Sequence, residues 1–338
     1  MRIGVSLNIH RLETASGSLY TDAMRTAEKV GFDGIWFFDA LGRGTFRVDP
    51  ISGMAAAAAV TDTIELGTCI LQVPLRGTVE LAHRILGIHY LSGGRIRLGV
   101  GTGSTEGDFK ATGNDFSARF RKLAEALPVM QALWRGEVVG DANLTPPDFA
   151  AGGPPILIGS WAGSRWIPIA ANDYDGWISS CHFTNIATLK EGYKRFKGEG
   201  GGRTVASNIP VDFSGGGGTL LDDDNLDLRC SEEEAKERLN LLAEIGFDDA
   251  IVTVNDFSED HMMAVRALHA CLATRGRSLD PLPYRRFHRP LGGIADVVTT
   301  AWQRPFGPFL VSMGAIAGGA FQGSTTGYAR ARPFDPTG

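Results

Sequence analysis

The fold is decided by residues 27–38, AEKVGFDGIWFF, which read as the end of a helix, a tight turn at Gly31 and a buried strand. Glycine at such a position accepts the left-handed conformation that commonly ends a helix. The pattern returns at residues 243–252 as AEIGFDDAIV, and more loosely at residues 172–178 as NDYDGWI. The strands are continuous apolar runs, which is typical of a sheet with both faces covered by helices. The repeat therefore predicts a parallel sheet built from helix–turn–strand units.

Eight apolar runs of this kind occur along the chain, and helical patterns fill the gaps between them. Alternation of strand and helix predicts an α/β protein, and the number eight favours a closed (β/α)8 TIM barrel. A doubly wound open sheet is the alternative that the pattern leaves open. The expected strands cover residues 2–7, 34–38, 64–71, 95–101, 155–159, 175–179, 209–213 and 249–254.

The composition of the chain changes near residue 280. Residues 281–338 contain six Arg, no Lys, two Asp and seven of the 16 prolines, and they are rich in glycine. An eight-fold barrel does not need this segment. We therefore expect a barrel over residues 1–280 and an irregular C-terminal extension over residues 281–338.

Composition also excludes several classes of function. Of 338 residues, 43% are hydrophobic and 21% charged, as in an average soluble globular protein. The net charge of −5 is a poor match for nucleic acid or an anionic lipid surface. Four widely spaced cysteines suggest neither a disulfide framework nor a metal site. The chain begins with a strand-like run rather than a secretion signal, so we expect a cytoplasmic protein that binds no metal, nucleic acid or membrane.

Residues 159–164, GSWAGS, form the strongest candidate binding loop. They follow an apolar strand and open a helical pattern, in which Ser164 is a suitable N-cap. The free N–H groups and the positive dipole end of a helix favour a phosphate at this place. We therefore predict that Ser160, Gly163 and Ser164 bind a phosphate. An ordinary helix cap without a ligand is the alternative.

Three alternating glycines, Gly99, Gly101 and Gly103, end the fourth expected strand. Barrel enzymes place their chemistry at the C-terminal ends of the strands. The missing side chains would let a flat ligand lie against the backbone there. Tight core packing around small residues is the alternative.

Four segments occur in order along the chain: GFDGIW at residues 31–36, IELGTC at 64–69, LSGGRIRLGVGTG at 91–103 and PILIGS at 155–160. On these segments, residues 1–275 resemble the luciferase-like flavin monooxygenase family, which includes bacterial luciferase and the deazaflavin-dependent dehydrogenases. The resemblance implies a (β/α)8 barrel that holds a flavin or deazaflavin at its C-terminal face.

The resemblance also implies cofactor-binding residues. Relatives have a non-prolyl cis peptide at the end of the third strand, which would fall near Cys69-Ile70, so Thr68 and Cys69 are expected beside the cofactor. Gly101 and Thr102 are expected there too, although bacterial luciferase has a reactive Cys and an Arg at these positions. Cys69 as an ordinary buried residue is the alternative.

Candidate acid–base groups are few. His10 follows the first strand and Asp39 the second, and we predict these two as catalytic residues. A histidine that only faces solvent or packs, and an aspartate that only orients a turn, are the alternatives. Further candidates at the same face are Arg43, Glu106, His182 and Asp212. The histidines that luciferase and the sugar-phosphate deazaflavin enzymes have after the second strand are absent, so neither light emission nor that dehydrogenase activity is expected.

The resemblance predicts a monooxygenase that uses reduced FMN and O2 to oxygenate a small organic substrate. A separate flavin reductase would supply the FMN, and the small residues 55–59 would form a homodimer contact. A hydride-transfer oxidoreductase that depends on the deazaflavin coenzyme F420 is the first alternative. A non-catalytic flavin-binding barrel is the second.

Overall fold

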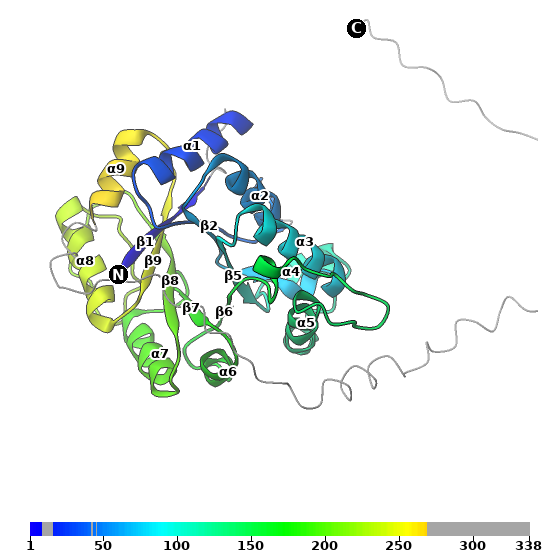
Figure 1. Cartoon of the computed structure of the whole chain (residues 1–338). Coiled ribbons are helices and arrows are strands. Elements are labelled where there is room, and N and C mark those ends of the chain that lie inside the picture. The colour runs from blue at the N-terminus through cyan, green and yellow to red at the C-terminus, as the bar shows by residue number, and fades with distance from the viewer. Residues whose placement is uncertain (9–15, 42, 45, 269–338) are drawn as a thin grey trace, which may run out of the picture. The chain divides into compact units, whose positions relative to one another are not determined.

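A closed barrel of parallel strands occupies the centre of the computed structural model, and helices cover its outside (Figure 1). The structure describes residues 1–8, 16–41, 43–44 and 46–268. The strands are β1 (Arg2–Leu7), β2 (Gly34–Phe37), β3 (Glu65–Thr68), β4 (Leu71–Gln72), β5 (Ile96–Gly101), β6 (Ile156–Gly159), β7 (Gly176–Ser180), β8 (Arg203–Pro210) and β9 (Asp249–Val254).

The helices follow the strands in the order that a (β/α)8 barrel requires. They are α1 (Gly17–Lys29), α2 (Pro50–Val60), α3 (Thr78–Leu91), α4 (Glu106–Ala111), α5 (Arg119–Trp134), α6 (Trp166–Asp173), α7 (Ile186–Gly198), α8 (Glu232–Ile245) and α9 (Glu259–Ala267). Short 3-10 turns cover Val73–Leu75 and Asp148–Ala150. Among the described residues, no helix combines the length and the apolar character that crossing a bilayer requires.

The sheet closes through β5, which pairs with both β3 and β4. Leu66 of β3 lies opposite Ile96, and Leu71 of β4 lies opposite Val100. Thus β3 and β4 together form one barrel strand, and the sheet order β3-β2-β1-β9-β8-β7-β6-β5-β4 describes an eight-fold barrel. The predicted (β/α)8 architecture is confirmed, and the open-sheet alternative is wrong.

The seventh expected strand was misplaced. It was predicted over residues 209–213, whereas β8 covers Arg203–Pro210. The strand begins with a charged residue, because the Arg203 guanidinium lies inside the barrel and pairs with Asp249. A register shift between Ala206 and Ile209, with Asn208 at φ 61°, also interrupts the apolar pattern. The expected boundary at residue 280 and the extension 281–338 lie outside the described residues.

Trp36 fills the middle of the barrel interior. Its side chain is 1% exposed, and glycines on three strands make room for it. A Cβ atom at Gly4 or at Gly34 would lie 2.7 Å from the indole ring, and one at Gly67 would also collide with it. Register sets this arrangement, since Gly4 lies opposite Gly34 and Trp36 opposite Gly67. The indole therefore occupies space that three missing side chains leave free.

Below Trp36, at the N-terminal end of the barrel, lies a layer of charged side chains. Arg203 binds Asp249 with two hydrogen bonds of 2.6 and 2.7 Å and approaches Glu65 at 3.0 Å. Arg2 donates to Glu65 at 2.6 Å, and Arg97 lies 3.3 Å from the same carboxylate. Buried charges are tolerated only when they are paired in this way. Within the described residues, Trp36 and these charges fill the middle and lower layers of the barrel, which leaves its C-terminal mouth for a ligand.

The packing around Trp36 predicts that one added methyl group would lower the stability of the fold. Gly67→Ala should lower the free energy of unfolding by about 1–3 kcal/mol, because the methyl overpacks the interior. The control is Gly87→Ala within α3, where no atom lies within 4 Å of the new Cβ. That variant should gain up to about 1 kcal/mol from helix propensity. Urea unfolding measures both, and equal stabilities of the two variants would contradict the packing account.

The charged layer at the N-terminal end of the barrel predicts that the stability of the fold decreases at acidic pH. Burial alone would raise the pKa of Glu65, but Arg203, Arg2 and Arg97 lower it to about 2. A depressed pKa contributes stability above the unfolded value of about 4.3 and loses it as the pH falls toward 2. Glu65→Gln should therefore destabilise the protein by about 3 kcal/mol at pH 7.

The same pairing predicts how the difference between wild type and Glu65→Gln changes with pH. It should stay constant above about pH 5 and shrink between about pH 4 and 2, since protonation removes the charge from the wild type as well. Chemical unfolding across this range measures it. A difference that is independent of pH would show that Glu65 is not held ionised by the arginines.

Candidate active site

Ile70 and Phe38 form an apolar floor at the mouth of the barrel. Both are half-buried and pack on the interior cluster that contains Trp36. A Cβ atom at Gly101 would lie 2.9 Å from Ile70 Cδ1, and one at Gly159 would also meet the Ile70 side chain. The glycines at the ends of β5 and β6 thus make room for Ile70. A flat ligand above this floor would rest on Ile70 rather than on bare backbone.

The peptide bond between Cys69 and Ile70 is cis, as the resemblance predicted. Thr68 and Cys69, two predicted cofactor-binding residues, are both buried. The Thr68 hydroxyl donates to the Gly99 carbonyl at 2.6 Å, so it links β3 to β5. Burial raises the pKa of the Cys69 thiol well above its usual value, which keeps it protonated and unreactive. Thr102 is half-buried and lies just beyond the end of β5.

The predicted phosphate loop lies between β6 and α6. The Ser160 N–H donates to Ile178 O and the Ser164 N–H to Trp161 O, which leaves the N–H groups of residues 161–163 without a partner among the described residues. The Ser160 hydroxyl is buried and likewise unpartnered. Nothing lies within 4 Å of a Cβ built on Gly163, so the loop is open there.

The prediction that Ser164 is the N-cap of the helix was wrong. The helix begins later, at Trp166, and its N-cap is Arg165. The Ser164 hydroxyl instead accepts from the Trp166 N–H at 3.1 Å, because residues 162–165 form a turn before the helix. Arg195 of α7 donates to the Ala162 carbonyl at 3.3 Å, which brings a positive charge behind the loop.

Asp39 lies buried in an ion pair. The Nη1 and Nη2 atoms of the Arg76 guanidinium donate to the two carboxylate oxygens of Asp39 at 2.6 and 3.1 Å. The backbone N–H of Gln72 also donates to this carboxylate, at 2.8 Å. Gln72 also bridges to Asp108 of α4 at 3.0 Å. The carboxylate therefore fixes β4 relative to the end of β2. This geometry is that of a positioning residue, and a catalytic role for Asp39 stays a prediction.

A second buried carboxylate, Asp108, accepts hydrogen bonds from the Nε and Nη2 atoms of Arg43 at 3.1 and 2.7 Å. Burial alone would raise the pKa of Asp108, but the hydrogen bonds from Arg43 and Gln72 lower it. Asp108 was missed from the sequence because α4 has only six residues and shows no clear periodicity. Its position in the first turn of a helix was the available signal.

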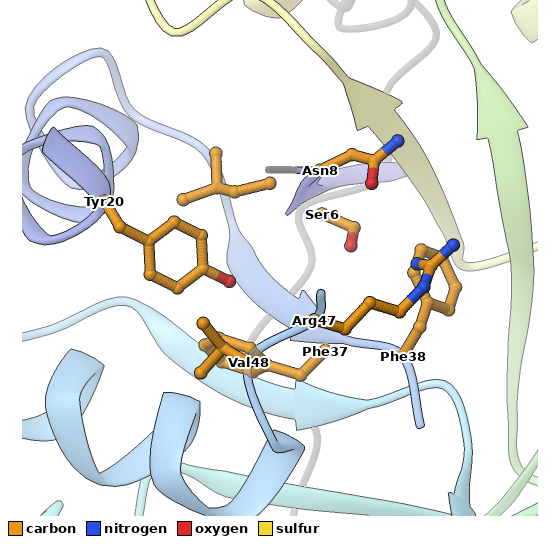
Figure 2. A pocket seen from close by; sticks show the side chains of 8 residues that line it. Ser6, Asn8, Tyr20, Phe37, Phe38, Arg47 and Val48 are labelled. Carbon is orange, nitrogen blue, oxygen red and sulfur yellow. The ribbon is translucent and has the colours of Figure 1, made fainter. Parts of the chain in front are cut away.

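A cavity opens over the ends of β1 and β2, beneath α1 (Figure 2). Its enclosed volume is only about 30 Å³, and the wider empty space of about 350 Å³ around it includes open solvent. Arg47 and Tyr20, which the sequence did not single out, are in its wall together with Phe38 of the floor. The remaining lining residues are Ser6, Leu7, Asn8, Phe37 and Val48.

Three further acid–base candidates, Glu106, His182 and Asp212, do not line this cavity. Glu106 pairs with Lys110 on the surface of α4, and Asp212 accepts from the N–H and hydroxyl of Ser214 in a local turn. His182 is exposed, with its ring 4.5 Å from that of Phe183. His10 lies outside the described residues. The part of the chain that the structure describes contains no cluster of three or more His, Cys, Asp or Glu suited to a metal ion.

Comparison with known proteins gives a family match over most of the barrel. The family model for luciferase-like monooxygenases matches residues 1–225. An F420-dependent glucose-6-phosphate dehydrogenase of Beutenbergia cavernae is 36% identical over 122 residues, which are 33% of this chain and 36% of that protein. A 4-hydroxyprotoasukamycin monooxygenase of Streptomyces nodosus subsp. asukaensis is 33% identical over 112 residues, 32% of this chain and 30% of that protein. The chain thus spans about a third of the length of these two curated relatives.

Solved structures share the fold at low sequence identity. The monooxygenase RslO1 from Streptomyces bottropensis superposes with a TM-score of 0.67 at 16% identity, over 82% of this chain and all of that one. At this identity the likeness concerns the fold alone. It agrees with the barrel closure described above.

The Asp39–Arg76 pair predicts strong coupling between the two side chains. Arg76→Gln should destabilise the fold by about 3–5 kcal/mol, because it leaves the buried Asp39 carboxylate without its cation. Asp39→Asn should cost less, because Asp49 still lies 3.3 Å from Arg76. The double variant should lose clearly less than the sum. A double-mutant cycle from urea unfolding measures the coupling. Additive losses would show that the ion pair does not hold this corner of the mouth.

Proposed function

Because the chain belongs to the luciferase-like monooxygenase family, we propose that it is an oxidoreductase that uses reduced FMN and O2 to oxygenate a small organic substrate. The observation that carries this proposal is the loop after β6. It combines a buried, unpartnered Ser160 hydroxyl with free N–H groups at residues 161–163 and an open position at Gly163. Backbone N–H groups and hydroxyls of this kind bind phosphate oxygens.

The apolar floor of Ile70 and Phe38 offers a place for the ring system of the flavin. Ile70 and Phe38 offer an apolar surface beside the loop, since Gly159 at the end of β6 contacts Ile70. A flavin isoalloxazine is flat and largely apolar, so it would bury area against these side chains. The phosphate would then lie at residues 160–163 and the ring over Ile70.

The charges at the mouth support chemistry led by the cofactor. A bound reduced flavin would supply the electrons and the activation of O2. Asp39 and Asp108 are each held by an arginine fork, and the Cys69 thiol is protonated. These groups position the strand ends and exclude water, rather than offering a free acid or base. The role of the chain would be to bind, orient and shield.

An F420-dependent hydride transfer is the second candidate. It is supported by the relative from Beutenbergia cavernae, which is named for that coenzyme. The deazaflavin also carries a ring system and a phosphate, so the loop and the floor suit it equally. The two candidates differ in their need for O2, because a deazaflavin passes a hydride and does not activate oxygen.

The phosphate loop predicts a charge-specific loss of cofactor binding. Gly163→Asp should weaken the binding of reduced FMN at least about 100-fold, because its carboxylate faces the phosphate. Gly163→Asn is the matched control, with the same shape and no charge, and it should bind within a few-fold of wild type. Anaerobic titration of reduced FMN and reduced F420, followed by fluorescence, measures all three proteins.

The outcomes of this titration separate the candidates. Preference for FMN, with turnover that consumes O2, supports the oxygenase. Preference for F420, with anaerobic turnover, would replace it by hydride transfer. Binding of neither cofactor, or equal binding by Gly163→Asp and Gly163→Asn, would overturn the assignment of the loop.

A further inference from the structure

The cavity over β1 and β2 contains the cation of Arg47, which has no acidic partner among the described residues. Arg47 is half-buried, and its Nε atom is buried without a hydrogen-bond partner. The neighbouring arginines are already paired, Arg43 with Asp108 and Arg76 with Asp39. Burial and the nearby charge of Arg43 both lower the pKa of Arg47, and no carboxylate of the described residues offsets them. A half-buried guanidinium with an unpartnered Nε atom would gain from an anion beside it.

Two hydroxyl groups share the cavity with Arg47. Figure 2 shows the Ser6 and Tyr20 hydroxyls directed into the same space, with the Arg47 side chain along its edge. Neither hydroxyl has a hydrogen-bond partner among the described residues. Burial raises the pKa of Tyr20, so its hydroxyl remains a donor at any physiological pH. The polar side of the cavity therefore offers the Arg47 guanidinium and the two hydroxyls, together with Asn8, whose Nδ2 already donates to Asn255 at 2.8 Å.

The other side of the cavity is apolar. Leu7, Phe37, Phe38 and Val48 line it, and Phe38 also belongs to the floor at the mouth. An occupant with an apolar body and one anionic end would satisfy both sides. A guanidinium fork matches the two oxygens of a carboxylate.

The cavity and the phosphate loop lie on opposite sides of the mouth. Counting β3 and β4 as one strand, β1 and β6 are four strands apart in either direction around the barrel. The loop after β6 is already assigned to the cofactor phosphate. The anion at Arg47 therefore comes from a second molecule, whose body would extend from Phe38 over the floor.

We propose that Arg47, with the Ser6 and Tyr20 hydroxyls, binds the carboxylate of the substrate, which is a small carboxylic acid with an apolar or aromatic body. This inference rests on the proposed function, because it assigns the substrate class of the same site. Arg47 is then a specificity-determining residue.

The test uses benzoate and its neutral isostere benzamide as probes. Isothermal titration of the 338-residue chain should give benzoate an affinity about ten-fold or more above that of benzamide, since a guanidinium binds a carboxylate through charge-assisted hydrogen bonds. Arg47→Gln should abolish this preference. Arg121→Gln, an exposed arginine of α5 that pairs with Glu125, is the control and should keep it.

Stability provides a second readout. Removal of an unbalanced, half-buried charge should leave the Tm of Arg47→Gln equal to or above that of wild type. A structural arginine would give the opposite result, a lower Tm. Equal affinity for benzoate and benzamide in wild type, or an unchanged preference in Arg47→Gln, would overturn the proposal.

FMN binding separates this inference from the proposed function. Arg47→Gln should bind reduced FMN as wild type does. Loss of FMN binding in Arg47→Gln, together with competition between inorganic phosphate and FMN at this residue, would assign the cavity to the cofactor phosphate and overturn the carboxylate site. If FMN fails to bind any variant while benzoate still depends on Arg47, the carboxylate site stands and the flavin proposal falls.

Discussion

The packing of Trp36 against three glycines is the constraint on which the rest of the structure depends. The indole fills the middle of the barrel because Gly4, Gly34 and Gly67 carry no Cβ atoms that would meet it. Below it, Arg203 and its partners fill the lower layer with paired charges. In the part of the chain that the structure describes, these two filled layers leave the C-terminal mouth for a ligand. The β6 loop, the floor and the Arg47 cavity all lie at that face.

At the mouth, some charged groups are paired within the protein, whereas other polar groups remain available to a ligand. Arg76 holds Asp39 at the end of β2, and Arg43 holds Asp108 in α4. These carboxylates therefore fix the geometry of the mouth. The Nε atom of Arg47 and the Ser160 hydroxyl differ from them, because both are buried and have no hydrogen-bond partner among the described residues. Unsatisfied buried donors in native proteins call for a ligand or an explanation. They lie on opposite sides of the floor, which suits one cofactor and one substrate.

Much of the fold and the candidate phosphate loop followed from local sequence, whereas the cavity at Arg47 and the ion pairs at the mouth did not. The repeated helix–turn–strand pattern predicted the barrel because Gly31 and Gly246 take the left-handed conformation that ends a helix. The strand β8 was misplaced because Arg203 is charged yet buried, and its partners come from distant strands. The cis bond after Cys69 was expected only from family resemblance. Arg47 gave no local signal, since its importance depends on which carboxylates other arginines occupy.

The most direct test of the account is the pattern of amide shifts in 15N-labelled protein when reduced FMN is added anaerobically. The account predicts the largest changes at residues 161–163, where free N–H groups would meet the phosphate, and smaller changes at Ile70 from the ring. The amides of β1 through β9 below Trp36 should not move. Shifts centred elsewhere, with residues 161–163 unchanged, would contradict the claim that the mouth between the β6 loop and Ile70 is the cofactor site.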